Sequence, residues 1–128
     1  MKINIVEKGP LTFYGIPHPS DTKSDFVSYW NEYYKNVSKE YRAPIGFSTF
    51  PDVDDKFTYY TCIQHEPENN DLFEVVQLPK GNYAIFELTG SVEKTIPRAW
   101  KFAKENFVIK DSPSLEVYSA GDRLSKKY

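Results

Sequence analysis

Two stretches of the chain carry apolar residues at helical spacing. The first stripe consists of Phe26, Trp30, Tyr33, Val37 and Tyr41, widened by Tyr29 and Tyr34. Intervals of three and four residues place such side chains on one face of an α-helix. The stripe is preceded by residue types that cap helix N-termini, namely Ser20, Asp21, Thr22 and Ser24. The pattern predicts an amphipathic helix with an aromatic face, which Pro44 brings to an end.

A second apolar stripe near the end of the chain predicts another helix. It is formed by Ile96, Trp100, Ala103 and Phe107. Ser91 or Thr95 can cap this helix. Pro97 then falls in the first turn, where a missing N–H costs no hydrogen bond. Core packing and a pocket wall are equally good accounts of Trp100 at this stage, because apolar stripes commonly face a core.

The segment before the first helix has the composition of a strand. It covers residues 3–16 and is interrupted at Gly9-Pro10. Because proline has no N–H to donate to a central β-ladder, we expect the strand to end at Pro17-His18-Pro19.

Two hairpins are predicted farther along the chain. Residues 45–50 and 56–64 are strand-like segments around the acidic turn at 51–55. Residues 73–90 contain two more such segments around Pro79-Lys80-Gly81-Asn82, where proline and glycine favour a turn. A last strand is expected at residues 112–122.

The two halves of the chain repeat the same order of elements. A strand ending near a glycine (Gly15, Gly90) is followed by a helix with a tryptophan (Trp30, Trp100) and then by another strand. This repetition predicts a single α+β domain over residues 1–128, in which two main helices cover a pseudo-twofold antiparallel sheet. Trp30 corresponds to Trp100 by its position in this repeat.

Composition narrows the class of function. The formal charge of −2 gives no footprint for nucleic acid, and no apolar run approaches the length of a membrane span. A single cysteine, Cys62, rules out an internal disulfide and suits a cytoplasmic protein. The two histidines, His18 and His65, have no second ligand at metal spacing, so we expect neither a metal nor a cofactor. The distinctive feature is the aromatic content of 16%.

The second half resembles the GyrI-like family, also known as bacterial transcription activator effector-binding domains. The stretches LPKGNYAIFELTG, RAW and PSLEVY carry the resemblance. The matching positions are Leu78, Pro79, Gly81, Tyr83, Ala84, Gly90, Trp100, Pro113, Glu116 and Tyr118. The chain departs from the family in two respects, since it has no helix-turn-helix module and ends before the family's last strand. We therefore expect a GyrI-like fold that lacks that strand.

The resemblance implies a groove between the halves that binds small cationic or aromatic molecules over a buried glutamate. It also implies that Trp30 is buried, so we assign Trp30 to the core. We expect a stand-alone binding protein that sequesters or senses toxic compounds. One alternative is a hydrolase of cyclopropane-bearing genotoxins, with Glu116 as general base and Tyr118 beside it. Another is a protein-interaction module, such as a gyrase-binding protein. A homodimer or a regulatory partner protein is also compatible with the family.

The orientation of Glu116 decides whether its carboxylate faces solvent or serves as the counter-ion of a ligand, and strand alternation allows both orientations. Glu116 and Tyr118 share one face of the strand, and Leu115 and Val117 share the other. Pattern alone favours a solvent-exposed carboxylate, whereas the resemblance favours a pocket. The expected ligand-binding set is Glu116, Tyr118, Trp100, Tyr59, Tyr33 and Tyr83. For each of the last three tyrosines, ordinary core packing is the competing account.

Overall fold

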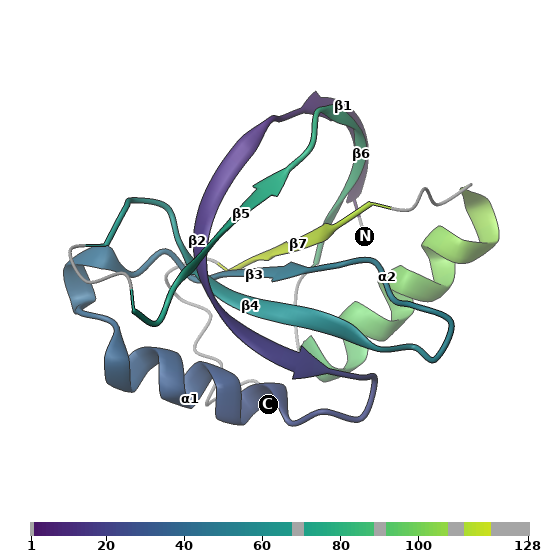
Figure 1. Cartoon of the computed structure of the whole chain (residues 1–128). Helices are drawn as coiled ribbons and strands as arrows, with labels where there is room; N and C mark the ends of the chain where they lie inside the picture. Colours follow the sequence, from purple (N-terminus) through teal and green to yellow (C-terminus); the bar gives the residue numbers. More distant parts are fainter. Residues whose placement is uncertain (1, 68–70, 89–91, 108–111, 119–128) are drawn as a thin grey trace.

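The computed structural model describes residues 2–67, 71–88, 92–107 and 112–118 (Figure 1). Its strands are β1 (Lys2–Lys8), β2 (Leu11–Ser20), β3 (Ile45–Ser48), β4 (Phe57–Ile63), β5 (Glu74–Leu78), β6 (Gly81–Glu87) and β7 (Ser114–Val117). Its helices are α1 (Phe26–Asn36), the short 3-10 helix η1 (Lys39–Tyr41) and α2 (Val92–Asn106). The prediction that the family's last strand is missing concerns the end of the chain, where residues 119–128 lie outside the described part.

The strands form two antiparallel sheets. The larger sheet has the order β5-β2-β4-β3-β7, and β1 pairs with β6 in a two-stranded sheet. The α+β class, with two main helices and open antiparallel sheets, is therefore confirmed. Neither of these helices is long and apolar enough to cross a membrane. The hairpin predicted around residues 51–55 is also confirmed, because β3 and β4 pair directly.

The second predicted hairpin is wrong in its pairing. β5 and β6 are strands, but β5 pairs with β2 and β6 pairs with β1. Figure 1 shows the two chain segments curving together from the large sheet up to β1 and β6. The turn after Leu78 is a bend that matches the bend at Gly9-Pro10, since Leu11 pairs with Leu78 and Lys8 with Gly81.

Gly9 makes this paired bend close-fitting, which gives a first testable prediction. Its φ is +87°, and a Cβ there would lie 2.7 Å from the carbonyl oxygen of Pro79. We expect Gly9→Ala to lower the free energy of unfolding by about 2 kcal/mol, because it adds both backbone strain and overlap. Gly81→Ala is the matched control, since its Cβ would make only ordinary contacts, the nearest at 3.7 Å. Urea unfolding of both variants measures the difference; equal losses would contradict it.

The end of β2 also departs from expectation. The strand continues through Pro17-His18-Pro19 to Ser20 and stays paired with β4. Pairing with β5 reaches only as far as Gly15, so the proline segment has a partner strand on one side. A proline is compatible with such a half-edge position when its nitrogen faces away from the partner.

Both helices form where they were predicted, but their caps, their ends and the exposure of Trp100 depart from the predicted stripes. The N-cap of α1 is Asp25, outside the predicted set, and its carboxylate accepts a hydrogen bond of 3.2 Å from the Ser28 N–H. The helix stops at Asn36, so Tyr41 belongs to η1. In α2, Phe102 meets Phe86 of β6 at a ring-centroid distance of 6.1 Å, whereas Trp100 is 42% exposed. Of the caps predicted for α2, Ser91 is not described and Thr95 is wrong, because it lies inside the helix. Pro97 also lies inside the helix and not in its first turn.

Apolar clusters lie on both faces of the five-stranded sheet. The cluster on the α1 side contains Ile16, Trp30, Tyr33, Val37, Tyr59, Ile63 and Tyr118. The cluster on the other side contains Phe13, Ile45, Phe47, Cys62 and Leu78, with Tyr83 and Leu115 against it. β2 and β4 supply apolar side chains to both clusters, and this double coverage is consistent with the high aromatic content.

Candidate functional site

Glu116 points toward the aromatic cluster beneath α1. It pairs with Gly46 across β3 and β7. Its neighbour Leu115 packs into the cluster on the opposite face, and Val117 is 73% exposed. The carboxylate is therefore directed inward, although the residue as a whole keeps partial access to solvent.

Two tyrosine hydroxyls converge on one oxygen of this carboxylate. Tyr59 and Tyr118 each donate a hydrogen bond of 2.8 Å to Oε1 of Glu116. The Tyr59 oxygen in turn accepts a 3.2 Å hydrogen bond from the indole N–H of Trp30. Trp30 is fully buried, and Tyr59 and Tyr118 are 2% and 8% exposed. The result is a connected polar group inside an aromatic shell, formed by α1, β4, β7 and Tyr118.

The electrostatics of the site leave the carboxylate without a cation. Burial raises the pKa of Glu116 above its ordinary range, while the hydrogen bonds from Tyr59 and Tyr118 oppose that rise. Among the described residues the ion pairs are Lys2–Glu87, Lys56–Asp21 and Lys80–Glu7, none of which involves Glu116. A carboxylate deprived of water is stabilised by hydrogen bonds, by a proton or by a bound positive charge. The two tyrosines supply hydrogen bonds to Oε1, and a bound positive charge would add to them.

Gly46 creates the space for this arrangement, and sequence reasoning missed it. A Cβ at this position would overlap the hydroxyl oxygen of Tyr59 and lie 3.2 Å from Oε1 of Glu116. The available signal was a glycine inside a predicted strand, which commonly marks a place where another group approaches the backbone closely.

The structure brings together three of the six predicted binding residues: Glu116, Tyr118 and Tyr59. Tyr33 is fully buried nearby, but its hydroxyl donates to the carbonyl of Cys62 and accepts from the Ala43 N–H. Burial raises the pKa of Tyr33 well above its ordinary value. This tyrosine therefore ties α1 to the sheet in the unliganded chain.

The other two predicted residues lie apart from the carboxylate. Tyr83 packs on the opposite face of the large sheet, and its hydroxyl donates to the carbonyl of Pro79 at 2.6 Å. Trp100 lies on α2 and is half-exposed. The contacts of this structure do not join either of them to Glu116.

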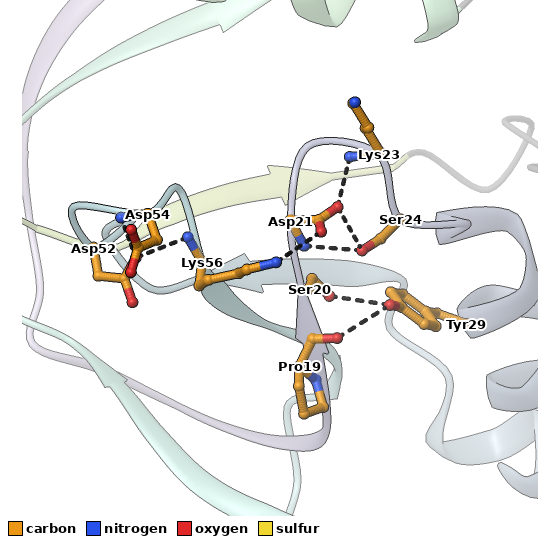
Figure 2. A network of polar contacts seen from close by, with 9 residues as sticks. All are labelled: Pro19, Ser20, Asp21, Lys23, Ser24, Tyr29, Asp52, Asp54 and Lys56. Carbon is orange, nitrogen blue, oxygen red and sulfur yellow. Dashed lines mark hydrogen bonds and ion pairs between the residues drawn. The ribbon is translucent and has the colours of Figure 1, made fainter.

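A separate cavity of about 330 Å³ lies near the start of α1. It is lined by Pro19, Ser20, Asp21, Ser24, Lys56 and Phe57. Figure 2 shows that its charged groups face each other: Lys56 reaches the Asp21 carboxylate at 3.1 Å, and Asp21 also accepts from the Lys23 N–H. These charged groups pair with one another and so stabilise the turn before α1. Glu116 is not among the residues that line this cavity.

Solved structures with the same fold carry further information. SAV2435 bound to tetraphenylphosphonium superposes with a TM-score of 0.71 and 18% identity, over 95% of this chain and 86% of that one. A Staphylococcus aureus MU50 protein assigned to bacterial transcription regulation gives a TM-score of 0.70 at 18% identity, over 95% and 89% of the chains. The Vibrio cholerae integron cassette protein VCH_CASS2 gives 0.79 at 16% identity, over 92% and 88%.

The family itself is established by sequence. No curated protein matches the chain. The sequence profile of the Cass2 family, described as integron-associated effector binding proteins, matches residues 4–127. This match confirms the resemblance to effector-binding domains that residues 78–118 indicated. The chain is a member of the Cass2 family of integron-associated effector binding proteins.

Proposed function

We propose that this protein binds lipophilic organic cations, with Glu116 as the counter-ion, in order to sequester or sense them. The observation that carries the proposal is the inward carboxylate of Glu116, hydrogen-bonded by Tyr59 and Tyr118 and without a basic residue in contact among those described. Removing an ionised carboxylate from water is costly unless it is paired. A ligand cation provides that pairing.

The aromatic residues around Glu116 favour an aromatic or lipophilic cation over a strongly hydrated one. The rings of Trp30, Tyr59 and Tyr118 lie around the carboxylate. Each well-placed ring face adds about 0.5–2 kcal/mol of cation–π attraction for a weakly hydrated cation. SAV2435, which shares the fold, binds tetraphenylphosphonium, a cation of this kind.

Glu116, Tyr118 and Tyr59 form the centre of the proposed site. The partial exposure of Glu116 on the short strand β7 provides the route by which a cation reaches the carboxylate. Trp100, Tyr33 and Tyr83 stay predicted ligand contacts. We also propose a cytoplasmic location, where a binding protein meets compounds that have entered the cell.

The proposal is tested with two ions of the same shape and opposite charge. Tetraphenylphosphonium and tetraphenylborate are titrated separately against tryptophan fluorescence and by calorimetry. We expect saturable one-to-one binding of the phosphonium only, because the site supplies one uncompensated negative charge. Equal binding of both ions would refute a role for charge. Turnover of a cyclopropane-bearing alkylator, measured alongside, would favour the hydrolase alternative instead.

The raised pKa of Glu116 predicts how affinity depends on pH. Below this pKa the carboxyl is neutral, so tetraphenylphosphonium affinity is lost as pH falls toward the ordinary value of 4.5. Above the raised pKa the carboxylate is charged and affinity reaches a plateau. We expect the midpoint to lie above 4.5, as measured by calorimetry across pH.

The unliganded protein should show the opposite trend in the same window. A carboxyl with a raised pKa binds its proton more tightly when folded, so stability falls as pH rises from 4.5 through the folded-state pKa. His18 is the nearby group to control for, because burial lowers its pKa from 6.5 and it pairs with Tyr59 across β2 and β4. A His18→Gln variant that kept the same affinity midpoint would exclude this histidine as the source.

A further inference from the structure

We propose that Trp30 is a positioning residue that fixes the Tyr59 hydroxyl as a hydrogen-bond donor to Glu116 and so keeps that carboxylate ready for a cation. This inference rests on the proposed function and adds to it a residue outside the predicted binding set. It begins from the direction of two hydrogen bonds, which the chemistry of the groups determines.

The indole N–H of Trp30 can only donate. At 3.2 Å from the Tyr59 oxygen it therefore makes that oxygen an acceptor. A phenol has a single proton, and this hydroxyl also lies 2.8 Å from Oε1 of Glu116. An ionised carboxylate can only accept, so the proton of Tyr59 is directed to Glu116.

The same geometry disfavours the protonated form of Glu116. A neutral carboxyl group must place its own proton on an acceptor when it is buried. A proton on Oε1 that is donated to Tyr59 would compete with the Trp30 N–H for the Tyr59 oxygen. Trp30 therefore weakens the neutral acid and supports the anion, although it does not touch Glu116 in the contacts described here.

Ring packing supports the same role independently. The indole of Trp30 meets the Tyr59 ring edge-on at 6.3 Å and 82°, and the Tyr118 ring edge-on at 5.7 Å and 79°. A single side chain from α1 thus positions both hydroxyls that donate to the carboxylate. Such edge-to-face contacts resist rotation of the rings, so the two donors are held in place before a ligand arrives.

Other titratable groups surround the site and must be separated from Glu116 in any measurement. They include Tyr59 of β4, Tyr118 after β7, Tyr29, Tyr33 and Tyr34 of α1, Tyr41 of η1, and Tyr14 and His18 of β2. β3 contributes Gly46, which does not titrate. A signal from the Glu116 carboxyl itself is therefore required.

The test is a carbon-13 NMR titration of the glutamate side-chain carboxyls in the unliganded full chain, with Glu116 assigned by Glu116→Gln. In Trp30→Phe we expect the Glu116 midpoint to rise by about one pH unit, as for the loss of one supporting hydrogen bond. Tetraphenylphosphonium affinity should fall by about tenfold below the new midpoint and recover above it. Tyr60→Phe is the matched control, because that neighbouring hydroxyl donates to Glu74 instead.

A second variant separates the loss of the indole N–H from a loss of ring packing. Replacing Trp30 with benzothienylalanine exchanges the indole N–H for sulfur at nearly constant shape, so it removes the donor but keeps the rings. The same upward shift is expected. An unchanged Glu116 midpoint in this variant would overturn the inference. Since the midpoint is read without ligand, it is independent of whether tetraphenylphosphonium binds; absence of binding by the native chain would overturn the proposed function alone.

Discussion

The Glu116→Gln substitution is expected to weaken tetraphenylphosphonium binding by at least about 30-fold at neutral pH, the equivalent of about 2 kcal/mol. Glutamine keeps the shape of the side chain, and its amide oxygen can still accept from Tyr59 and Tyr118, whose 2.8 Å bonds hold the carboxylate now. The substitution therefore removes the charge and leaves the surrounding shell in place. Calorimetric titration of both proteins measures the change.

Stability should move in the other direction. Because burial raises the pKa of Glu116, the folded state carries a cost for its charge at neutral pH. Glu116→Gln removes that cost, so the variant should unfold at an equal or higher urea concentration.

Glu74→Gln is the matched control for the binding measurement. Glu74 also accepts from a tyrosine hydroxyl, that of Tyr60, but it is exposed at the other edge of the sheet. We expect this variant to bind tetraphenylphosphonium as the native chain does. Equal affinity of Glu116→Gln and Glu74→Gln would show that no specific carboxylate holds the cation.

Local elements of the fold could be predicted from sequence, and non-local pairings could not. The helix α1 and the β3–β4 hairpin depend on periodicity and on a turn within a short segment. The pairing of β5 with β2 and of β6 with β1 depends on segments about sixty residues or more apart, as with Leu11 and Leu78. A proline-glycine bend looks the same in sequence whether it reverses the chain or only bends it.

The prediction that β2 ends at its prolines was wrong for a related reason. The rule that proline ends a strand applies to a strand with partners on both sides. Pro17 and Pro19 lie beyond the last pairing of β2 with β5, at Gly15. Where a neighbouring strand ends is a tertiary property, so residue types alone did not reveal that this part of β2 is a half-edge.

The direction of Glu116 was undecided because alternation assumes one apolar face. Here both faces of the sheet are covered, and Leu115 packs on one while the carboxylate enters the other. Family resemblance suggested the inward orientation, but it did not identify Tyr59 and Tyr118 as the two hydrogen-bond donors that stabilise the buried carboxylate. Trp30 was predicted to be core and is buried, yet its N–H also belongs to the hydrogen-bonded group.

Gly46→Ala is expected to disrupt the site from the backbone side. The added Cβ would overlap the Tyr59 hydroxyl and lie 2.8 Å from its Cζ, so Tyr59 must leave its position over Gly46. We expect a loss of about 1–3 kcal/mol in the free energy of unfolding, as for other overpacked interiors. Tetraphenylphosphonium affinity should fall by about tenfold, because Glu116 loses one of its two hydroxyl donors.

Two further variants separate this effect from general destabilisation. Gly15→Ala also introduces overlap inside a strand, 2.7 Å from Cβ of Tyr60, but on the face away from Glu116. It should lower stability while the folded protein keeps its affinity. In the double variant Gly46→Ala/Tyr59→Phe the overlapping hydroxyl is gone but the ring carbon Cζ, 2.8 Å from the added Cβ, stays, so stability should recover in part while affinity stays low. A double-mutant cycle in which the two substitutions were simply additive in stability would contradict the contact between them.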